Sequence, residues 1–111
     1  MNFRVKWTTR AQDDLDRLFD FIDERELARD DGDLSLAVRA IAAVREATAM
    51  LQRSPAACRK VTADGSVREL VVSSGTAGYL VLFDMPHAGW VRVVAVRVVA
   101  VRHQLEDGYA E

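Results

Sequence analysis

Cationic, imidazole and phenol side chains in the second half of the chain are its clearest candidates for chemistry. They are Arg59, Lys60, Arg68, Arg102, His103 and Tyr109. Cleavage of RNA by its own 2′-hydroxyl requires a base, cations beside the phosphate, and an acid for the leaving oxygen. Arg68 and Arg102 could clamp a phosphate, and His103, with an ordinary pKa of about 6.5, could accept or donate a proton. Tyr109 could be the acid or a platform for base stacking.

Each of these residues also has a plain structural interpretation. Arg68 stands next to Glu69, as charges on a strand surface do, and surface arginines often contribute little. His103 could be a polar residue at a strand end, and Tyr109 lies near a terminus, where packing or fraying is common. The set has one lysine, and the chain has a low isoelectric point, so as a nuclease site it is incomplete.

Neither a metal nor another cofactor is predicted. Cys58 is the single cysteine, so it can form neither an intramolecular disulfide nor a multi-cysteine zinc site, and a cytoplasmic location is expected. The acidic residues between positions 13 and 26 follow no metal-ligand pattern and suit a solvated helix face. Residues 1–8 alternate charged and apolar types, which predicts no signal peptide, no spanning helix and no membrane association.

Length and composition predict one soluble globular domain spanning residues 1–111. The chain has a mass of 12.4 kDa, is 50% hydrophobic and 29% charged, and carries a formal net charge of -2. An isoelectric point near 5.7 argues against nonspecific nucleic-acid binding by the whole molecule. Acidic residues are concentrated between positions 11 and 33, however, so the rest of the chain could still form a local basic face.

The first half of the chain reads as one strand followed by two helices. Residues 2–7 alternate apolar and polar types, as a strand with one buried face does. Thr9 and Gln12 have the spacing of a capping box, and an apolar stripe then runs to about residue 28. A second stripe covers residues 34–51, with Asp33 or Ser35 as its cap, and ends before Pro55.

The second half reads as strands. Residues 67–72, 79–84 and 90–102 are predicted strands, separated by turns over residues 73–78 and 86–89. Sequential hairpins make these three strands antiparallel. The resulting order, β-α-α-β-β-β, predicts an α+β fold in which a helical hairpin packs on an antiparallel sheet.

A tandem repeat, VRVVA at residues 91–95 and again at 96–100, lies in the last predicted strand. Because five is odd, an unbroken strand would point Arg92 and Arg102 to one face and Arg97 to the other, which is covered. Thirteen residues would also span about 43 Å, which is long for a domain of about 13 Å radius of gyration. We therefore expect a β-bulge or break near residues 96–98, or an overhang that pairs with another chain.

Several segments resemble the RelE/ParE superfamily of toxins from bacterial type II toxin–antitoxin pairs, also called plasmid-stabilisation proteins. They are "TTRAQDDLDRLFDFI", "LQRSP", "VRELVV", "GYLVLF" and "VAVRHQLEDGY". The resemblance covers nearly the whole chain and is closer to ParE-like members. The repeated VVAVR unit departs from it and looks like a five-residue insertion.

The resemblance implies a toxin that a cognate antitoxin neutralises, in a toxin–antitoxin hetero-oligomer. ParE-like members bind and poison DNA gyrase without chemistry of their own; RelE-like members cut messenger RNA on the ribosome, for which Arg68, Arg102, His103 and Tyr109 would be the catalytic residues. The low isoelectric point favours the gyrase poison, and a degenerate member that only binds antitoxin is the third alternative. The residues expected to contact partners are Phe19, Phe21, Arg92 and Arg97, since both phenylalanines cannot share a narrow core stripe.

Overall fold

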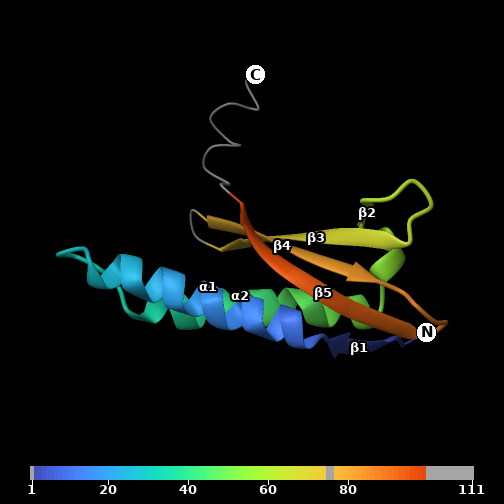
Figure 1. Ribbon diagram of the computed structural model, residues 1–111, viewed down its shortest axis with the longest axis horizontal. Helices are drawn as coiled ribbons and strands as arrows, with labels where there is room; N and C mark the ends of the chain where they lie inside the picture. The colour runs from blue at the N-terminus through green and yellow to red at the C-terminus, as the bar shows by residue number, and fades with distance from the viewer. Residues whose placement is uncertain (1, 75–76, 100–111) are drawn as a thin grey trace, which may run out of the picture.

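The computed structural model describes residues 2–74 and 77–99, and it consists of two helices on one face of a five-stranded sheet (Figure 1). The helices are α1 (Thr9–Leu27) and α2 (Ser35–Ala49). The strands are β1 (Arg4–Trp7), β2 (Arg59–Lys60), β3 (Val67–Ser74), β4 (Ala77–Asp84) and β5 (Trp90–Val99). Two short 3₁₀ turns, η1 (Met50–Gln52) and η2 (Pro55–Ala57), lead from α2 to β2.

The sheet has the order β1-β5-β4-β3-β2. Strands β3, β4 and β5 pair antiparallel as predicted, and β2 joins β3 in the same way, but β1 pairs with β5 in parallel, so the sheet is mixed. The predicted helical hairpin on a sheet is confirmed, and the two-residue strand β2 is an addition to the predicted order. The predicted turn over residues 73–78 is too long, because β3 continues to Ser74 and β4 begins at Ala77.

Helix α1 begins one residue earlier than the predicted capping box. Thr8 is the N-cap, and its hydroxyl oxygen accepts a hydrogen bond from the Ala11 amide at 3.1 Å. The Thr8 amide donates to Val93 O at 3.0 Å, so the residue that ends the pairing of β1 also starts the helix. Thr9 is already helical. Either of the two adjacent threonines could serve as the N-cap, and the pairing with β5 selects the first of them.

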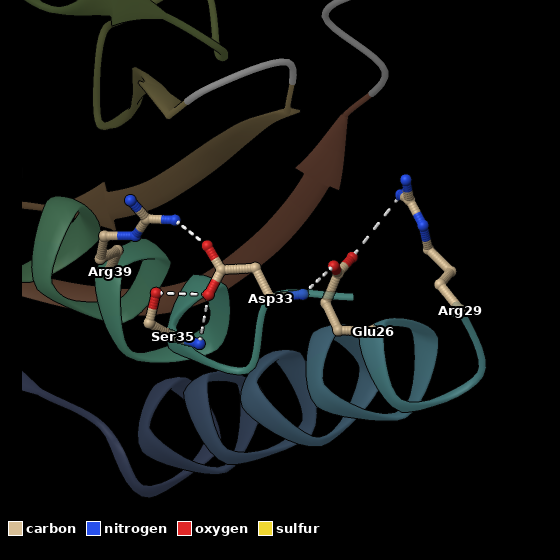
Figure 2. A network of polar contacts seen from close by, with 5 residues as sticks. All are labelled: Glu26, Arg29, Asp33, Ser35 and Arg39. Atoms are coloured by element: carbon tan, nitrogen blue, oxygen red, sulfur yellow. Dashed lines mark hydrogen bonds and ion pairs between the residues drawn. The ribbon is translucent and has the colours of Figure 1, made fainter. Parts of the chain in front are cut away.

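A network of polar contacts closes the connection between the helices (Figure 2). The Glu26 carboxylate, which is almost fully buried, accepts a hydrogen bond from the Asp33 amide at 2.9 Å. Asp33 in turn accepts bonds from the amide and hydroxyl of Ser35 at 2.9 and 2.6 Å. The N-cap position itself is Leu34, whose side chain makes no capping bond, so neither predicted cap, Asp33 or Ser35, occupies that position, although Asp33 still binds the first residue of α2. A Cβ on Gly32 would lie 1.8 Å from Glu26 O, so this tight connection requires glycine.

The core lies between the helices and the sheet face that they cover. Alternate strand residues fill it from the sheet side: Val72, Tyr79, Val81, Phe83, Val91, Val93 and Val96. The helices contribute the predicted stripe, with Ala11, Leu15 and Leu18 from α1. The opposite side of the strands, which we call the open face, carries no helix among the described residues and holds Leu82, Asp84 and Arg92.

A bulge in β5 lets the repeated sequence keep its valines in the core. Phe83 pairs with Val93 and Leu82 with Ala95, so Val94 has no partner on β4. The extra residue cancels the odd spacing of the repeat, and Arg92 and Arg97 therefore both lie on the open face. The predicted bulge is confirmed in kind, but its predicted place at residues 96–98 is wrong. Val93 and Val96 must both enter the core, which sets the bulge between them.

Candidate functional site

Arg68 is the predicted nuclease residue that lies on β3. Its guanidinium binds backbone carbonyls of the neighbouring segment. Arg68 shares the covered face of the sheet with Leu70 and Val72. Its Nη1 donates to Ala56 O at 3.1 Å and to Cys58 O at 2.8 Å, which fastens η2 and β2 to β3. Its Nε is buried without a hydrogen-bond partner among the described residues. The arginine therefore has a structural use that the sequence does not reveal.

The remaining residues around Arg68 do not assemble a catalytic group. Arg59 lies on the open face and pairs with Glu69. Lys60 lies opposite Arg68 in the register and so belongs to the covered face. Burial raises the pKa of the Cys58 thiol, against the opposite effect of the Arg68 charge, so the thiolate is disfavoured. The predicted Arg102, His103 and Tyr109 lie outside the described residues, and their catalytic role stays a prediction.

In residues 2–74 and 77–99, no three His, Cys, Asp or Glu side chains come together as metal ligands. Within those residues, no helix is both long and apolar enough to cross a membrane.

A second candidate site is a groove along α1 and β5, one end of which also reaches α2, β3 and β4. It consists of two hollows of about 210 Å³ each, and both are lined by Leu18, Phe21 and Val98. We call this pair of hollows the edge groove. Phe21 lies at its centre with 46% of its surface exposed, and Val98 is 51% exposed. Apolar side chains left exposed in a concave surface are typical of a protein-binding site.

One side of the edge groove is an open strand edge. Strand β1 covers the outer edge of β5 only from Trp90 to Val93, and no described strand covers the edge from Val94 to Val99. The Val96 amide, which points away from β4, donates instead to the Asp14 carboxylate of α1 at 2.9 Å. Because outward-pointing groups alternate along a strand, the Val98 amide and carbonyl point the same way. An extended peptide could bind there.

Charged side chains surround the apolar part of the groove. At the end near the α1–α2 connection, Arg25, Glu26 and Arg29 line the first hollow, and the Arg25 guanidinium lies 5.4 Å from the centroid of the Phe21 ring. At the other end, Asp14 accepts a hydrogen bond from Arg17 at 2.5 Å while it binds Val96. The groove therefore combines apolar anchors with charges of both signs at its rim.

The predicted partner-binding residues separate in the structure. Phe21 lines both hollows and Arg97 lines the second, whereas the half-buried Phe19 lines neither. Arg92 lies on the open face, where Asp84 binds its guanidinium at 3.0 and 2.7 Å and raises its pKa.

Sequence reasoning missed Asp14. It lies three residues after Ala11 and four before Leu18, so its position on the core stripe of α1 was an available signal.

Comparisons with known proteins agree with this fold. A family model described as "ParE toxin of type II toxin-antitoxin system, parDE" matches residues 5–108. Among solved structures, a chain of the chromosomal ParDE toxin–antitoxin system from P. aeruginosa matches with a TM-score of 0.65 and 18% sequence identity. The match covers 87% of this chain and 96% of that chain, and at this identity it shows the fold alone. No curated protein matches.

Proposed function

Since this chain belongs to the ParE toxin family of type II toxin–antitoxin systems, we propose that it arrests growth by binding and poisoning DNA gyrase. In this proposal a cognate antitoxin neutralises it. The observation that carries the proposal is the match to the ParE toxin family over residues 5–108. The contacts of Arg68 add support, because a guanidinium that donates to two backbone carbonyls is poorly placed to clamp a substrate phosphate.

The edge groove is the proposed site for the antitoxin. An apolar side chain of the antitoxin would pack on Phe21, and its backbone would pair with the free edge of β5 at Val98, as in strand addition to an open sheet. Pairing at Val96 as well would require the antitoxin to displace the Asp14 carboxylate. Asp14 thus covers the edge in the unbound toxin, which protects it from unspecific strand pairing.

The gyrase proposal is tested by inducing the chain without antitoxin and measuring DNA supercoiling and messenger-RNA integrity in the same culture. Cleaved or relaxed DNA with intact message is the expected result. A purified toxin should also yield a gyrase-dependent DNA-cleavage complex. Message cut at codon-spaced positions with normal supercoiling would instead identify a ribonuclease, whose Arg102 and Tyr109 should then be replaced. Absence of growth arrest would leave a degenerate member that binds antitoxin only.

The antitoxin site is tested by replacing Phe21 with alanine and measuring the affinity for the antitoxin. A central aromatic anchor commonly contributes about 2 kcal/mol or more, so the affinity should fall roughly thirtyfold. Phe19→Ala is the matched control, because Phe19 lies on the same helix but lines neither hollow. Equal losses of affinity in the two variants would argue against the edge groove. Thermal unfolding of both variants separates lost binding from lost folding.

A further inference from the structure

The open face of the sheet holds a cluster of positive charges beside an aromatic ring. The parallel register of β1 and β5 places Arg4 opposite Trp90 and Lys6 opposite Arg92. The Arg4 guanidinium lies 5.4 Å from the centroid of the Trp90 ring, and the Lys6 ammonium lies 5.2 Å from it. Both cations are exposed, and one ring therefore holds two like charges close together.

The acidic residues of this face do not neutralise that pair. Asp84 forms a two-bond contact with Arg92, and Glu69 pairs with Arg59. Among residues 2–74 and 77–99, neither Arg4 nor Lys6 forms an ion pair. Two like charges beside one ring, with no ion-paired carboxylate among the described residues, raise the local positive potential, which attracts anions.

Further charge of the same sign lies on this face. The bulge at Val94 also places Arg97 on the open face, about 16 Å beyond Arg92 along β5 and beside the edge groove, and within the described residues Arg97 forms no ion pair. We call Arg4, Lys6 and Arg97 the cationic patch. The other layer is acidic: α1 carries Asp13, Asp16, Asp20, Asp23 and Glu24 in addition to its groove residues. A molecule of net charge -2 would therefore approach a polyanion with its open face first.

We propose that the cationic patch binds phosphate groups of duplex DNA, so that the toxin touches the DNA that gyrase holds as well as the enzyme. The proposal rests on the proposed gyrase function for its choice of polyanion. Extended backbone spaces Arg4 and Lys6 by about 6.6 Å on one face, and duplex DNA offers closely spaced phosphates to such a row. Contacts to phosphates carry no sequence information, so the binding is independent of sequence.

The test is the affinity of the purified toxin for a short fluorescent DNA duplex, measured between about 50 and 200 mM salt. Three phosphate contacts predict a slope of log affinity against log salt of about -3, at roughly -0.9 per contact. Replacing Arg4 and Lys6 with alanine should reduce the slope to about -1 and weaken binding at least tenfold at the low-salt end. Lys6→Gln, which removes the charge but keeps part of the side-chain stem, should lose about one contact and serves if the double variant folds poorly.

The matched control replaces Arg10 and Arg45 with alanine. It removes the same net charge from the helix layer, and it also removes a cation–π contact, because Arg45 lies 5.5 Å from the centroid of the Trp7 ring. The control should keep the wild-type slope. Equal losses in the two double variants, or no DNA binding by the wild type at low salt, would overturn the proposal.

Two further outcomes separate this inference from the proposed function. If the Arg4 and Lys6 variant loses affinity for gyrase in the absence of DNA, the patch binds an acidic protein surface and the DNA proposal is wrong. If the wild type binds DNA through the patch but forms no gyrase-dependent cleavage complex, the patch stands and the gyrase proposal fails.

Discussion

The two faces of the sheet are built from the same strands and differ in what they contact. On the covered face, Tyr79, Val81 and Phe83 alternate along β4 and are almost completely removed from solvent. On the open face of the same strand, Leu82 is half-buried and Asp84 binds Arg92. Burial on one face therefore supplies stability, while the other face can hold exposed charges at little cost and is available for contacts.

The largest expected difference between the faces comes from neighbouring residues of β4. Phe83→Ala should lower the free energy of unfolding by about 3–5 kcal/mol, because Phe83 is fully buried and its removal leaves a cavity. Leu82→Ala, on the open face, should cost about 1 kcal/mol. Chemical denaturation of both variants measures this difference. Similar losses would mean that the open face is also packed against something.

Because of the bulge, deleting a residue from β5 and inserting one should have different effects on stability. Deleting Val94 removes the unpaired residue and leaves every later residue of β5 on its present face, so the loss of stability should stay near 1 kcal/mol. Inserting one valine between Val96 and Arg97 would turn Arg97 to the covered face and should cost roughly 2–3 kcal/mol. Unfolding midpoints of the two variants check this order. A deletion as damaging as the insertion would contradict the assigned bulge.

Asp84→Asn should leave stability nearly unchanged and should strengthen DNA binding, whereas the loss of Arg4 and Lys6 should weaken it. The substitution releases Arg92 from its carboxylate and adds a positive charge to the open face. If the cationic patch binds phosphates, the affinity for duplex DNA should rise a fewfold while the thermal midpoint barely moves. Glu69→Gln, which releases the more distant Arg59, is the matched control with a smaller expected rise. A fall in DNA affinity for Asp84→Asn would count against the patch.

The prediction with the smallest effect at neutral pH concerns the titration of the Tyr79 phenol. Burial raises the pKa of its phenol above the ordinary value near 10, because the charged form would lose its hydration. A group with a raised folded pKa contributes stability below its unfolded pKa, and that contribution is lost as the pH rises through the folded value. In Tyr109→Phe, where Tyr79 is the single tyrosine left, ultraviolet titration should show this late midpoint. An ordinary midpoint with the fold intact would place Tyr79 in solvent.

Residue patterns determined the elements and the composition of the core. The alternation around Val5 and the stripe through Leu15 and Leu18 specify which side of each element is apolar, since that pattern is local to the chain. The odd repeat also predicted a bulge, because without one Arg97 would point into the core, although its predicted place near residues 96–98 was wrong. The prediction of Phe21 as a contact residue rested on the same stripe, and the structure places it in the edge groove.

Only the tertiary structure decided where those elements meet. It chose Thr8 over Thr9 as the cap, placed the bulge at Val94, laid β1 parallel to β5, and gave Arg68 two carbonyls to hold. It also gathered Arg4 and Lys6 around Trp90, which lies more than eighty positions along the chain. A sequence pattern reports the neighbours within a few residues, whereas strand order and cross-strand register follow from packing the whole core at once, which no short segment contains.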